Sequence, residues 1–269
     1  MGMGSDSVIL ISIIVLGGIG LLCGILLMVA SKFFSVAIDE RVGELITMLP
    51  GANCGVCGFA GCAQYAKNLI SGQSPANSCK VVDQEKSMAI AAFIGVKNEG
   101  IVKEVAVLRC QGGDGVVPRS ADYTGLKTCR AAALFFGGDK ACSYGCLGYG
   151  DCVKVCPFQA ISRGENGLVV INAAKCVGCG LCVKECPKEM LLLLPSTSEV
   201  YVACLSKDRG KKVTQVCKKG CIACRKCEKA CPVQAIVVED NLAKIDFLKC
   251  TNCGLCGEAC PTESIGRRY

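Results

Sequence analysis

The chain has 269 residues, a formal net charge of +7, 25 cysteines, no histidine and no tryptophan. That length suits one large domain or two to three small ones, and aromatic residues make up only 5% of it. So little aromatic material excludes an ordinary apolar core as the sole source of stability, which leaves disulfides or metal. The absence of histidine excludes Rieske centres and haem bound through imidazole.

The first predicted element is a membrane helix. Residues 8–30, VILISIIVLGGIGLLCGILLMVA, are uncharged and long enough to cross a bilayer. A cleaved signal peptide is the alternative, but no Lys or Arg precedes this stretch and no clear cleavage site follows it. Lys32 follows it closely and favours a cytoplasmic location for the rest of the chain. We expect residues 1–31 to be a single-pass anchor in the cell (inner) membrane, with the metal-binding domains in the cytoplasm, where thiols stay reduced.

Residues 32–90 are predicted to form a small iron–sulfur domain. Within LPGANCGVCGFAGCAQYA (residues 49–66), three cysteines are separated by two and four residues, and a fourth follows after a helix-length gap. Four such thiols suit a [4Fe-4S] cluster, although the spacing alone would also allow a [2Fe-2S] centre. The predicted ligands are Cys54, Cys57, Cys62 and Cys79.

The C-terminal half of the chain repeats itself. Residues 175–187 (KCVGCGLCVKECP) match residues 249–261 (KCTNCGLCGEACP), and CVKVCPFQAI matches CEKACPVQAI in the same order. One unit of two cysteine motifs therefore occurs twice. We expect dicluster domains over residues 136–200 and 201–269, preceded by a connecting region over residues 91–135.

Three of these four motifs follow the bacterial ferredoxin run C-x2-C-x2-C-x3-C-P. Two-residue gaps let three thiolates bind one cubane, whereas the fourth cysteine binds the neighbouring cluster. Zinc is the competing metal, but zinc sites usually pair separated C-x2-C knuckles and often use histidine. The predicted sets are Cys221, Cys224, Cys227 and Cys260; Cys250, Cys253, Cys256 and Cys231; Cys176, Cys179, Cys182 and Cys156; and, from an irregular motif with gaps of three and five residues, Cys142, Cys146, Cys152 and Cys186.

Four cysteines outside the anchor remain. Two precede the motifs of the first dicluster domain and two lie between the motifs of the two domains: Cys110, Cys129, Cys204 and Cys217. They are either ordinary thiols or the ligands of a further site. Because a fold that sets the two domains side by side could join these pairs, we expect a sixth [4Fe-4S] cluster beside the five above, with residues 91–135 contributing to it.

The charge pattern must be corrected for the clusters. An oxidised cubane with four thiolates carries about −2, so six of them change the net charge from +7 to about −5. The apparent basicity therefore does not indicate a nucleic-acid partner. A local excess of cations remains between residues 207 and 226. It is either a solvated turn that offsets cluster charge or a docking face for an acidic ferredoxin.

The predicted fold class is α+β: one N-terminal transmembrane helix, a small 4Fe-4S domain, and tandem ferredoxin-like (βαββαβ) dicluster domains. In this order of features the chain resembles the B subunits of Rnf complexes, which are membrane-bound, ion-translocating ferredoxin:NAD oxidoreductases. The resemblance rests on the membrane helix, LPGANCGVCGFAGCAQYA, CQGGDG, GCLGYGDCVKVCPFQAI and the tandem repeats. One departure is that KVVD follows Cys79, where the family is expected to have a Pro-Gly-Gly-like turn.

The resemblance implies a role in electron transfer. It implies that the chain accepts electrons from soluble reduced ferredoxin and relays them through [4Fe-4S] clusters to other Rnf-type membrane subunits of a Na⁺- or H⁺-translocating complex. The sequence has no P-loop, dinucleotide fingerprint, catalytic triad or paired-carboxylate motif, so we expect no catalytic site on this chain. One alternative is a polyferredoxin subunit of another anaerobic membrane redox complex, of the hydrogenase or formate-oxidising type. Another is a structural zinc protein.

Overall fold

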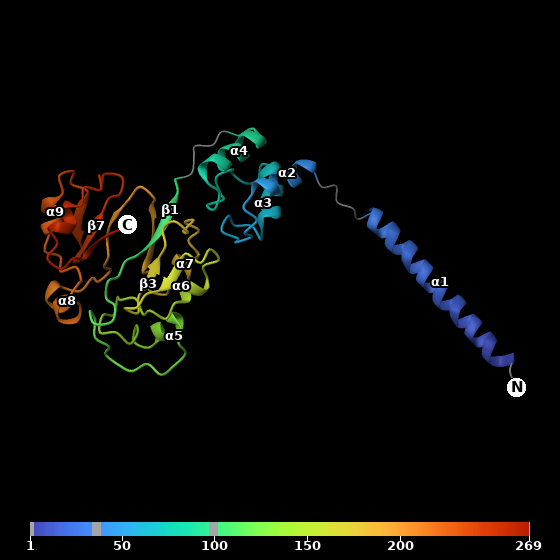
Figure 1. Cartoon of the computed structure of the whole chain (residues 1–269), viewed down its shortest axis with the longest axis horizontal. Helices are drawn as coiled ribbons and strands as arrows, with labels where there is room; N and C mark the ends of the chain where they lie inside the picture. Colours follow the sequence, from blue (N-terminus) through green and yellow to red (C-terminus); the bar gives the residue numbers. More distant parts are fainter. Residues whose placement is uncertain (1–2, 34–38, 97–101, 269) are drawn as a thin grey trace. The chain divides into compact units, whose positions relative to one another are not determined.

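The computed structural model describes residues 3–33, 39–96 and 102–268. The chain divides into two compact units, residues 1–44 and 45–269. Helix α1 (Met3–Phe33) makes up most of the first unit and is the long blue helix of Figure 1. Helix α2 (Glu40–Met48) spans the boundary between the units.

Helix α1 contains a segment suited to a membrane. From Ile9 to Phe33 its 25 residues have a mean hydropathy of 2.8, so by length and composition the segment could cross a bilayer. At a rise of about 1.5 Å per residue it is about 37 Å long, more than the ~30 Å hydrocarbon core. Its apolar side chains are exposed, for example Leu16 at 70% and Leu27 at 71%. Exposed leucines over this length suit contact with lipid tails.

The N-terminal part of the second unit contains a buried tyrosine on helix α3 (Cys62–Ile70). Helix α3 and helix α4 (Gln84–Ile94) are joined by an irregular segment. Tyr65 of α3 is 1% exposed, and its hydroxyl lies 3.1 Å from the carbonyl oxygens of both Pro75 and Ala76. This side chain therefore ties the irregular segment back onto α3.

The rest of the second unit contains short helices and strands. In the described residues the strands form four antiparallel pairs: β1 (Glu104–Leu108) with β4 (Leu191–Pro195), β2 (Ile161–Arg163) with β3 (Val169–Ile171), β5 (Val200–Val202) with β8 (Ile265–Arg267), and β6 (Ile236–Glu239) with β7 (Leu242–Ile245). The helices are α5 (Cys129–Leu134), α6 (Asp151–Lys154), α7 (Leu181–Glu185), α8 (Gly210–Val216), α9 (Lys226–Ala230) and α10 (Leu255–Glu258).

The element order repeats as the cysteine motifs do. A strand, an inserted helix, a short helix, a hairpin, a second short helix and a strand that pairs with the first occur twice, as β1 to β4 and as β5 to β8. Strand β1 lies within residues 91–135, which the sequence assigns to a connecting region. Its short apolar run, EVAVL, carries no cysteine and no strong period, so the sequence does not identify it as a module strand.

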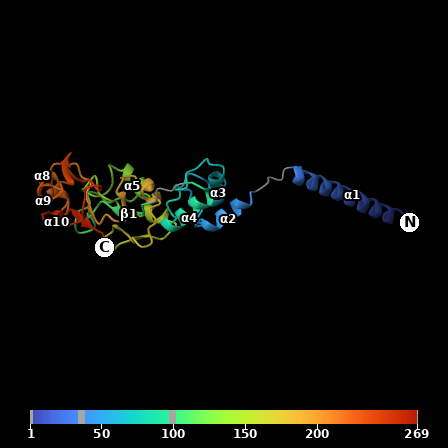
Figure 2. The ribbon, with the colours of Figure 1, turned by 90° about the horizontal axis from the view of Figure 1, so that it is seen from above.

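Apolar strands and cysteines form common cores. Val105, Ile161, Val169 and Leu191 pack in one core with three cysteines of the first repeat, and a second core joins strand residues of the second repeat with its cysteines. In both Figure 1 and Figure 2, α8 and α9 lie at the same end of the second unit, and Figure 2 places α10 beside them. Because strand residues and cysteines share these two cores, the strands form the walls of the regions where the cysteines gather.

The cysteine motifs also share left-handed backbone positions. The residue two before the third cysteine of each motif has positive φ. Glycine, which has no Cβ to clash, supplies this conformation in three motifs, but in the third motif along the chain an arginine adopts it. The four residues are Gly150, Gly180, Arg225 and Gly254, with φ of 83°, 77°, 58° and 86°.

Replacing this arginine by glycine should stabilise the fold. Arg225→Gly is expected to raise the free energy of unfolding by about 1 kcal/mol, because it removes left-handed strain. The Arg225–Glu228 contact at 3.6 Å and the hydrogen bond from Arg225 Nη2 to the Val238 carbonyl oxygen at 3.4 Å are long and partly exposed to solvent, so they add little. Anaerobic denaturant unfolding of the full chain, followed by circular dichroism, measures this change.

Gly254→Ala is the reciprocal control. A Cβ at Gly254 would meet only the Arg267 Nη1 atom at 3.6 Å, an ordinary contact, so its cost comes from the backbone. This variant should lose about 1 kcal/mol. A fall in stability for Arg225→Gly would mean that the arginine side chain stabilises the fold more than its backbone strains it.

Candidate iron–sulfur sites

Six groups of cysteines are found in the second unit, and we number them 1 to 6. Site 2 is a pocket lined by Cys156, Cys176, Cys179 and Cys182, with apolar residues and a glycine as the rest of its lining. The Ala106 amide donates to Cys176 Sγ at 3.4 Å. Burial raises the pKa of Cys182 to about 12, and the nearby Cys179, Cys176 and Cys156 raise it further. Cys156 thus joins a motif that begins after β3.

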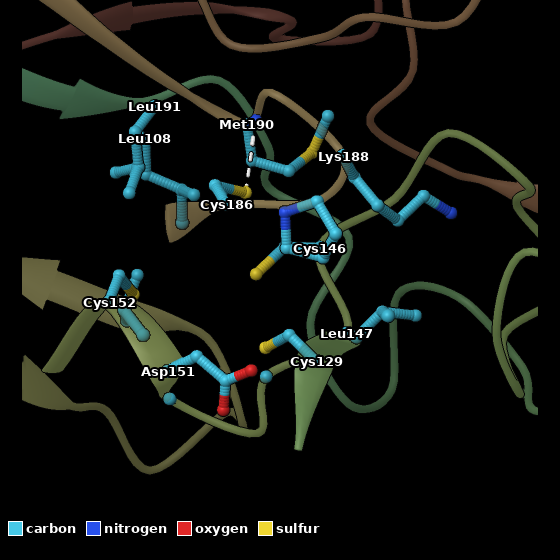
Figure 3. A pocket seen from close by; sticks show the side chains of 14 residues that line it. Leu108, Cys129, Cys146, Leu147, Asp151, Cys152, Cys186, Lys188, Met190 and Leu191 are labelled. Atoms are coloured by element: carbon cyan, nitrogen blue, oxygen red, sulfur yellow. Dashed lines mark hydrogen bonds between the residues drawn. The ribbon is translucent and has the colours of Figure 1, made fainter. Parts of the chain in front are cut away.

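Site 3 is a pocket around Cys129, Cys146, Cys152 and Cys186, which Figure 3 shows from close by. Burial raises the pKa of Cys152 to about 12, with Cys146, Cys129 and Cys186 among the groups that add to it. The Met190 amide donates to Cys186 Sγ at 3.3 Å, drawn as a dashed line in Figure 3. Cys129 is the first residue of α5, so this site draws a cysteine from outside the regular motifs.

Site 4 is a pocket around Cys110, Cys142, Cys204 and Cys217. Cys110 Sγ accepts hydrogen bonds from the amides of Gly112 at 3.3 Å and Cys146 at 3.4 Å. Cys204 Sγ accepts one from the Ser206 amide at 3.4 Å, and burial raises the pKa of Cys204 to about 11. Two cysteines come from the first repeat and two from the second, so this site lies where the repeats meet.

Two cysteines therefore lie in different groups from those predicted from the sequence. The sequence placed Cys142 with Cys146, Cys152 and Cys186, and Cys129 with the leftover thiols. The structure places Cys129 in site 3 and Cys142 in site 4. The irregular gaps explain the difference, because gaps of three and five residues put Cys142 beyond the tight loop that two-residue gaps form.

A buried carboxylate holds Cys129 in site 3. Asp151 is 8% exposed and lines the site 3 pocket, and its Oδ2 atom accepts a hydrogen bond from the Arg130 amide at 3.1 Å. Thr128 caps the same helix by accepting from the Ala131 amide at 3.2 Å. Asp151 thus joins the start of α5 to the start of α6. Asp151 is not among the residues predicted from the sequence, although it is the only acidic residue between Cys146 and Cys156.

Sites 5 and 6 use the last two regular motifs. Burial raises the pKa of Cys227 to about 11, and Cys221, Cys260 and Cys224 are near enough to raise it further, which defines site 5. The Ser264 amide donates to Cys260 Sγ at 3.3 Å.

Site 6 groups Cys250, Cys253 and Cys256, and Cys231 is the cysteine of the last two motifs that is left to complete it. Burial raises the pKa of Cys256, and the nearby Cys250 and Cys253 add to it. The Ala235 amide donates to Cys231 Sγ at 3.2 Å, the same contact that Met190 and Ser264 make in their motifs. Cys253 is exposed, as is Cys224 of site 5, so both sites reach the surface.

Site 1 lies around α3 and the irregular segment that follows it. Burial raises the pKa of Cys79, the amides of Val81 and Val82 lower it in part, and Cys57 and Cys54 raise it. These amides belong to the KVVD segment, so this segment supplies hydrogen bonds to the sulfur. Cys62 begins α3. Tyr65, which sequence reasoning missed, fixes the segment that leads to Cys79, and burial together with Cys79 raises the pKa of Tyr65 to about 12.

The donor chemistry of these sites fits iron–sulfur clusters better than single metal ions. Zinc sites usually pair separated C-x2-C knuckles and often use histidine, which this sequence lacks. Cysteines spread around a pocket, with backbone amides donating to their sulfurs, suit a larger cluster.

Comparison with known proteins agrees with this chemistry. Residues 49–81 match a family described as a putative Fe-S cluster, and residues 141–190 and 220–264 match the 4Fe-4S dicluster domain. The chain is 44% identical, over 92% of its length and 94% of the relative's, to the B subunit of the ion-translocating oxidoreductase complex of Methanosarcina acetivorans.

Two further relatives carry more specific names. The B subunit of the Na⁺-translocating ferredoxin:NAD⁺ oxidoreductase complex of Acetobacterium woodii is 44% identical over 91% of this chain and 74% of its own length. The B subunit of the proton-translocating ferredoxin:NAD⁺ oxidoreductase complex of Clostridium ljungdahlii is 42% identical over 92% of this chain and 87% of its own.

Removing the clusters should unfold the second unit. The cores contain the cysteines themselves, so an empty site leaves buried thiols around a void and loses the bonds that hold its loops. Anaerobic treatment of the full chain with an iron chelator is expected to abolish its cooperative thermal transition in circular dichroism. Reloading with iron and sulfide should be favoured as pH rises, because the thiols must lose protons to bind metal. A cooperative transition in the iron-free protein would contradict this expectation.

Proposed function

Because the chain belongs to the family of B subunits of ion-translocating (Rnf-type) oxidoreductase complexes, we propose that it is the electron-transfer subunit of a membrane-bound ferredoxin:NAD⁺ oxidoreductase that translocates Na⁺ or H⁺. It accepts electrons from reduced ferredoxin and relays them to membrane subunits, and it has no catalytic site of its own. The observation that carries this proposal is the series of cysteine groups in one compact unit, three of which are pockets lined by four cysteines each.

Each site would hold one [4Fe-4S] cluster, which supplies a one-electron carrier when bound. The ligand sets are Cys54, Cys57, Cys62 and Cys79 for site 1; Cys156, Cys176, Cys179 and Cys182 for site 2; Cys129, Cys146, Cys152 and Cys186 for site 3; Cys110, Cys142, Cys204 and Cys217 for site 4; Cys221, Cys224, Cys227 and Cys260 for site 5; and Cys231, Cys250, Cys253 and Cys256 for site 6.

The sites follow one another in this order from 1 to 4. Cys54 of site 1 is among the groups that, after burial, raise the pKa of Cys179 in site 2. Cys182 of site 2 acts in the same way on Cys152 of site 3. Cys110 of site 4 is the first thiol, after burial, that raises the pKa of Cys146 in site 3.

The series continues into the second repeat. Cys221 of site 5 is near enough to Cys204 of site 4 to raise its pKa, after burial. Helix α9 carries Cys227 of site 5 and ends just before Cys231 of site 6, so a single helical turn of about 6 Å separates ligands of these two sites. Site 4 is thus the link between the repeats, and its loss would divide the series into two parts.

The remaining features fit a membrane-bound relay. Helix α1 serves as a single-pass anchor in the inner membrane, with the iron–sulfur domains on its cytoplasmic side. The repeats β1 to β4 and β5 to β8 have the βαββαβ order of dicluster ferredoxins, each with an inserted helix, which supports the tandem ferredoxin-like fold. The small domain over residues 32–90 carries the site nearest to the anchor in sequence.

A docking face for ferredoxin lies on α8 and its flanks. The inner side of α8 places Val213 and Val216 in the lining of site 4. Within residues 207–226, three of the cations have acidic partners, such as Lys212 with Asp208 at 2.9 Å. The others are exposed, without a carboxylate partner among the described residues, and would attract an acidic carrier. They are Lys207, Arg209, Lys211, Lys218 and Lys226.

Iron content and a pair of serine variants test the ligand sets. The anaerobically purified chain should contain about 24 iron and 24 sulfide, whereas about 20 would leave site 4 empty. Cys129→Ser and Cys142→Ser should each lose about four iron. Alkylation followed by mass spectrometry then identifies the cysteines that become free.

The two variants serve as controls for each other. Cys129→Ser should free Cys146, Cys152 and Cys186, and Cys142→Ser should free Cys110, Cys204 and Cys217. The reverse result would restore the grouping predicted from the sequence. Protection of both sets in both variants, with unchanged iron, would refute these ligand sets.

Charge reversal tests the docking face. The double variant Lys207→Glu with Lys211→Glu should be reduced by ferredoxin about tenfold more slowly than the wild type at low salt. High salt should bring the two rates closer together, because it screens the exposed charges. Stopped-flow absorbance measures the rate. Lys67→Glu with Lys86→Glu changes the net charge equally, on exposed positions of α3 and α4, and should have little effect. Equal rates and equal salt dependence for the two variants would exclude this face.

A further inference from the structure

Two cations stand beside site 4. Arg109 lines its pocket, next to Cys110 in the chain, and burial lowers the pKa of Arg109 while Cys204 opposes this. Lys188 Nζ donates to the carbonyl oxygens of Gly137, at 2.5 Å, and of Ser143. Ser143 follows Cys142, so these hydrogen bonds hold the ammonium group beside site 4.

Lys188 also lies between two sites. It lines the pocket of site 3, and Figure 3 shows its side chain extending away from the centre of that pocket. Its ammonium group is held by the carbonyl oxygen of Ser143, next to Cys142 of site 4, so its charge lies beside both sites.

Neither cation is neutralised by a protein carboxylate. Among the described residues, no Asp or Glu forms an ion pair with Arg109 or Lys188. Lys219, which lines the same pocket, differs because Glu263 lies 3.0 Å from its ammonium group. Arg109 and Lys188 are thus uncompensated charges at site 4, as is the buried Lys140, whose Nζ donates to the Gly112 carbonyl oxygen in the pocket lining at 2.8 Å.

The neighbouring sites have a different environment. The pocket of site 2 has no charged residue in its lining. That of site 3 includes charges of both signs, Lys188 and the Asp151 carboxylate, whose Oδ1 atom is buried without a hydrogen-bond partner. Sulfurs of site 4 accept amide hydrogen bonds from Gly112, Cys146 and Ser206. Positive charge and hydrogen bonds to sulfur both favour the reduced, more negative state of an iron–sulfur cluster.

We propose that site 4 is the most easily reduced of sites 2, 3 and 4, and that Arg109 and Lys188 are the residues that set this order. The inference rests on the proposed function, in which reduced ferredoxin supplies the electron. One electron leaves the ferredoxin and enters site 4, whose cluster with its four thiolates changes from about −2 to about −3. No proton moves and no bond is formed or broken. Site 4 would then collect electrons where the two repeats meet.

Redox titration of the full chain, monitored by electron paramagnetic resonance, tests this order. The signal of site 4 is the one that Cys142→Ser removes and Cys129→Ser retains. Arg109→Met and Lys188→Met remove the charges with side chains of similar length. Arg109→Lys and Lys188→Arg keep the charges. Lys184→Met removes an exposed charge on α7, four residues before Lys188. It is the control for a lysine whose charge is screened by solvent.

The wild-type signal of site 4 should have the highest midpoint potential of the three. Each methionine variant should make site 4 about tenfold harder to reduce, which is 59 mV for one electron. The charge-keeping variants should retain the wild-type value, and Lys184→Met should stay near it. If Lys188→Met loses iron, Lys188→Gln keeps a donor for the two carbonyls and replaces it.

Two outcomes would overturn the inference. One is a wild-type potential of site 4 below that of site 2 or site 3. The other is a pair of methionine variants that retain about 24 iron and titrate as Lys184→Met does. Both leave the six-site relay intact, because iron content and the presence of the site 4 signal test that relay separately.

Discussion

Hydrogen bonds from backbone amides to cysteine sulfurs recur at almost every site of this protein and organise the segments around them. Met190, Ala235 and Ser264 each donate to the cysteine four residues before them, and Ala106 donates across the fold to Cys176. A buried sulfur that binds iron carries negative charge, and amide donors offset the cost of removing that charge from water. The left-handed turns, the short helices and the flanking strands all orient these amides.

The same geometry explains how the sites form a series. Each repeat exchanges a cysteine between its two sites, so that one helical turn joins neighbours, as α7 does between Cys182 and Cys186. Between the repeats no such helix is found in the described residues. Site 4 draws Cys110 and Cys142 from one repeat and Cys204 and Cys217 from the other, and therefore makes the connection only when both repeats are folded and packed.

Charge follows from the same arrangement. With the six proposed clusters the formal +7 of the chain would become about −5, so its cations would mainly oppose cluster charge. The position of each cation determines the role that it suits. Exposed lysines around α8 face solvent, where salt screens them, whereas Arg109 and Lys188 are partly buried beside site 4, where their fields are stronger. Surface cations suit attraction of a carrier, and partly buried ones suit control of potential.

Local spacing and composition were enough to predict part of this protein. Gaps of two residues keep Cys176, Cys179 and Cys182 within one loop, since each residue spans at most about 3.5 Å. The membrane-spanning helix α1 can also be predicted from the sequence, because it depends on the composition of one apolar run alone. Other features emerged only from the folded chain. The exchange of Cys129 with Cys142, the pairing of β1 with β4, and the contacts of Asp151 and Lys188 join residues far apart in the chain. Such contacts depend on how whole segments pack, which no local pattern records.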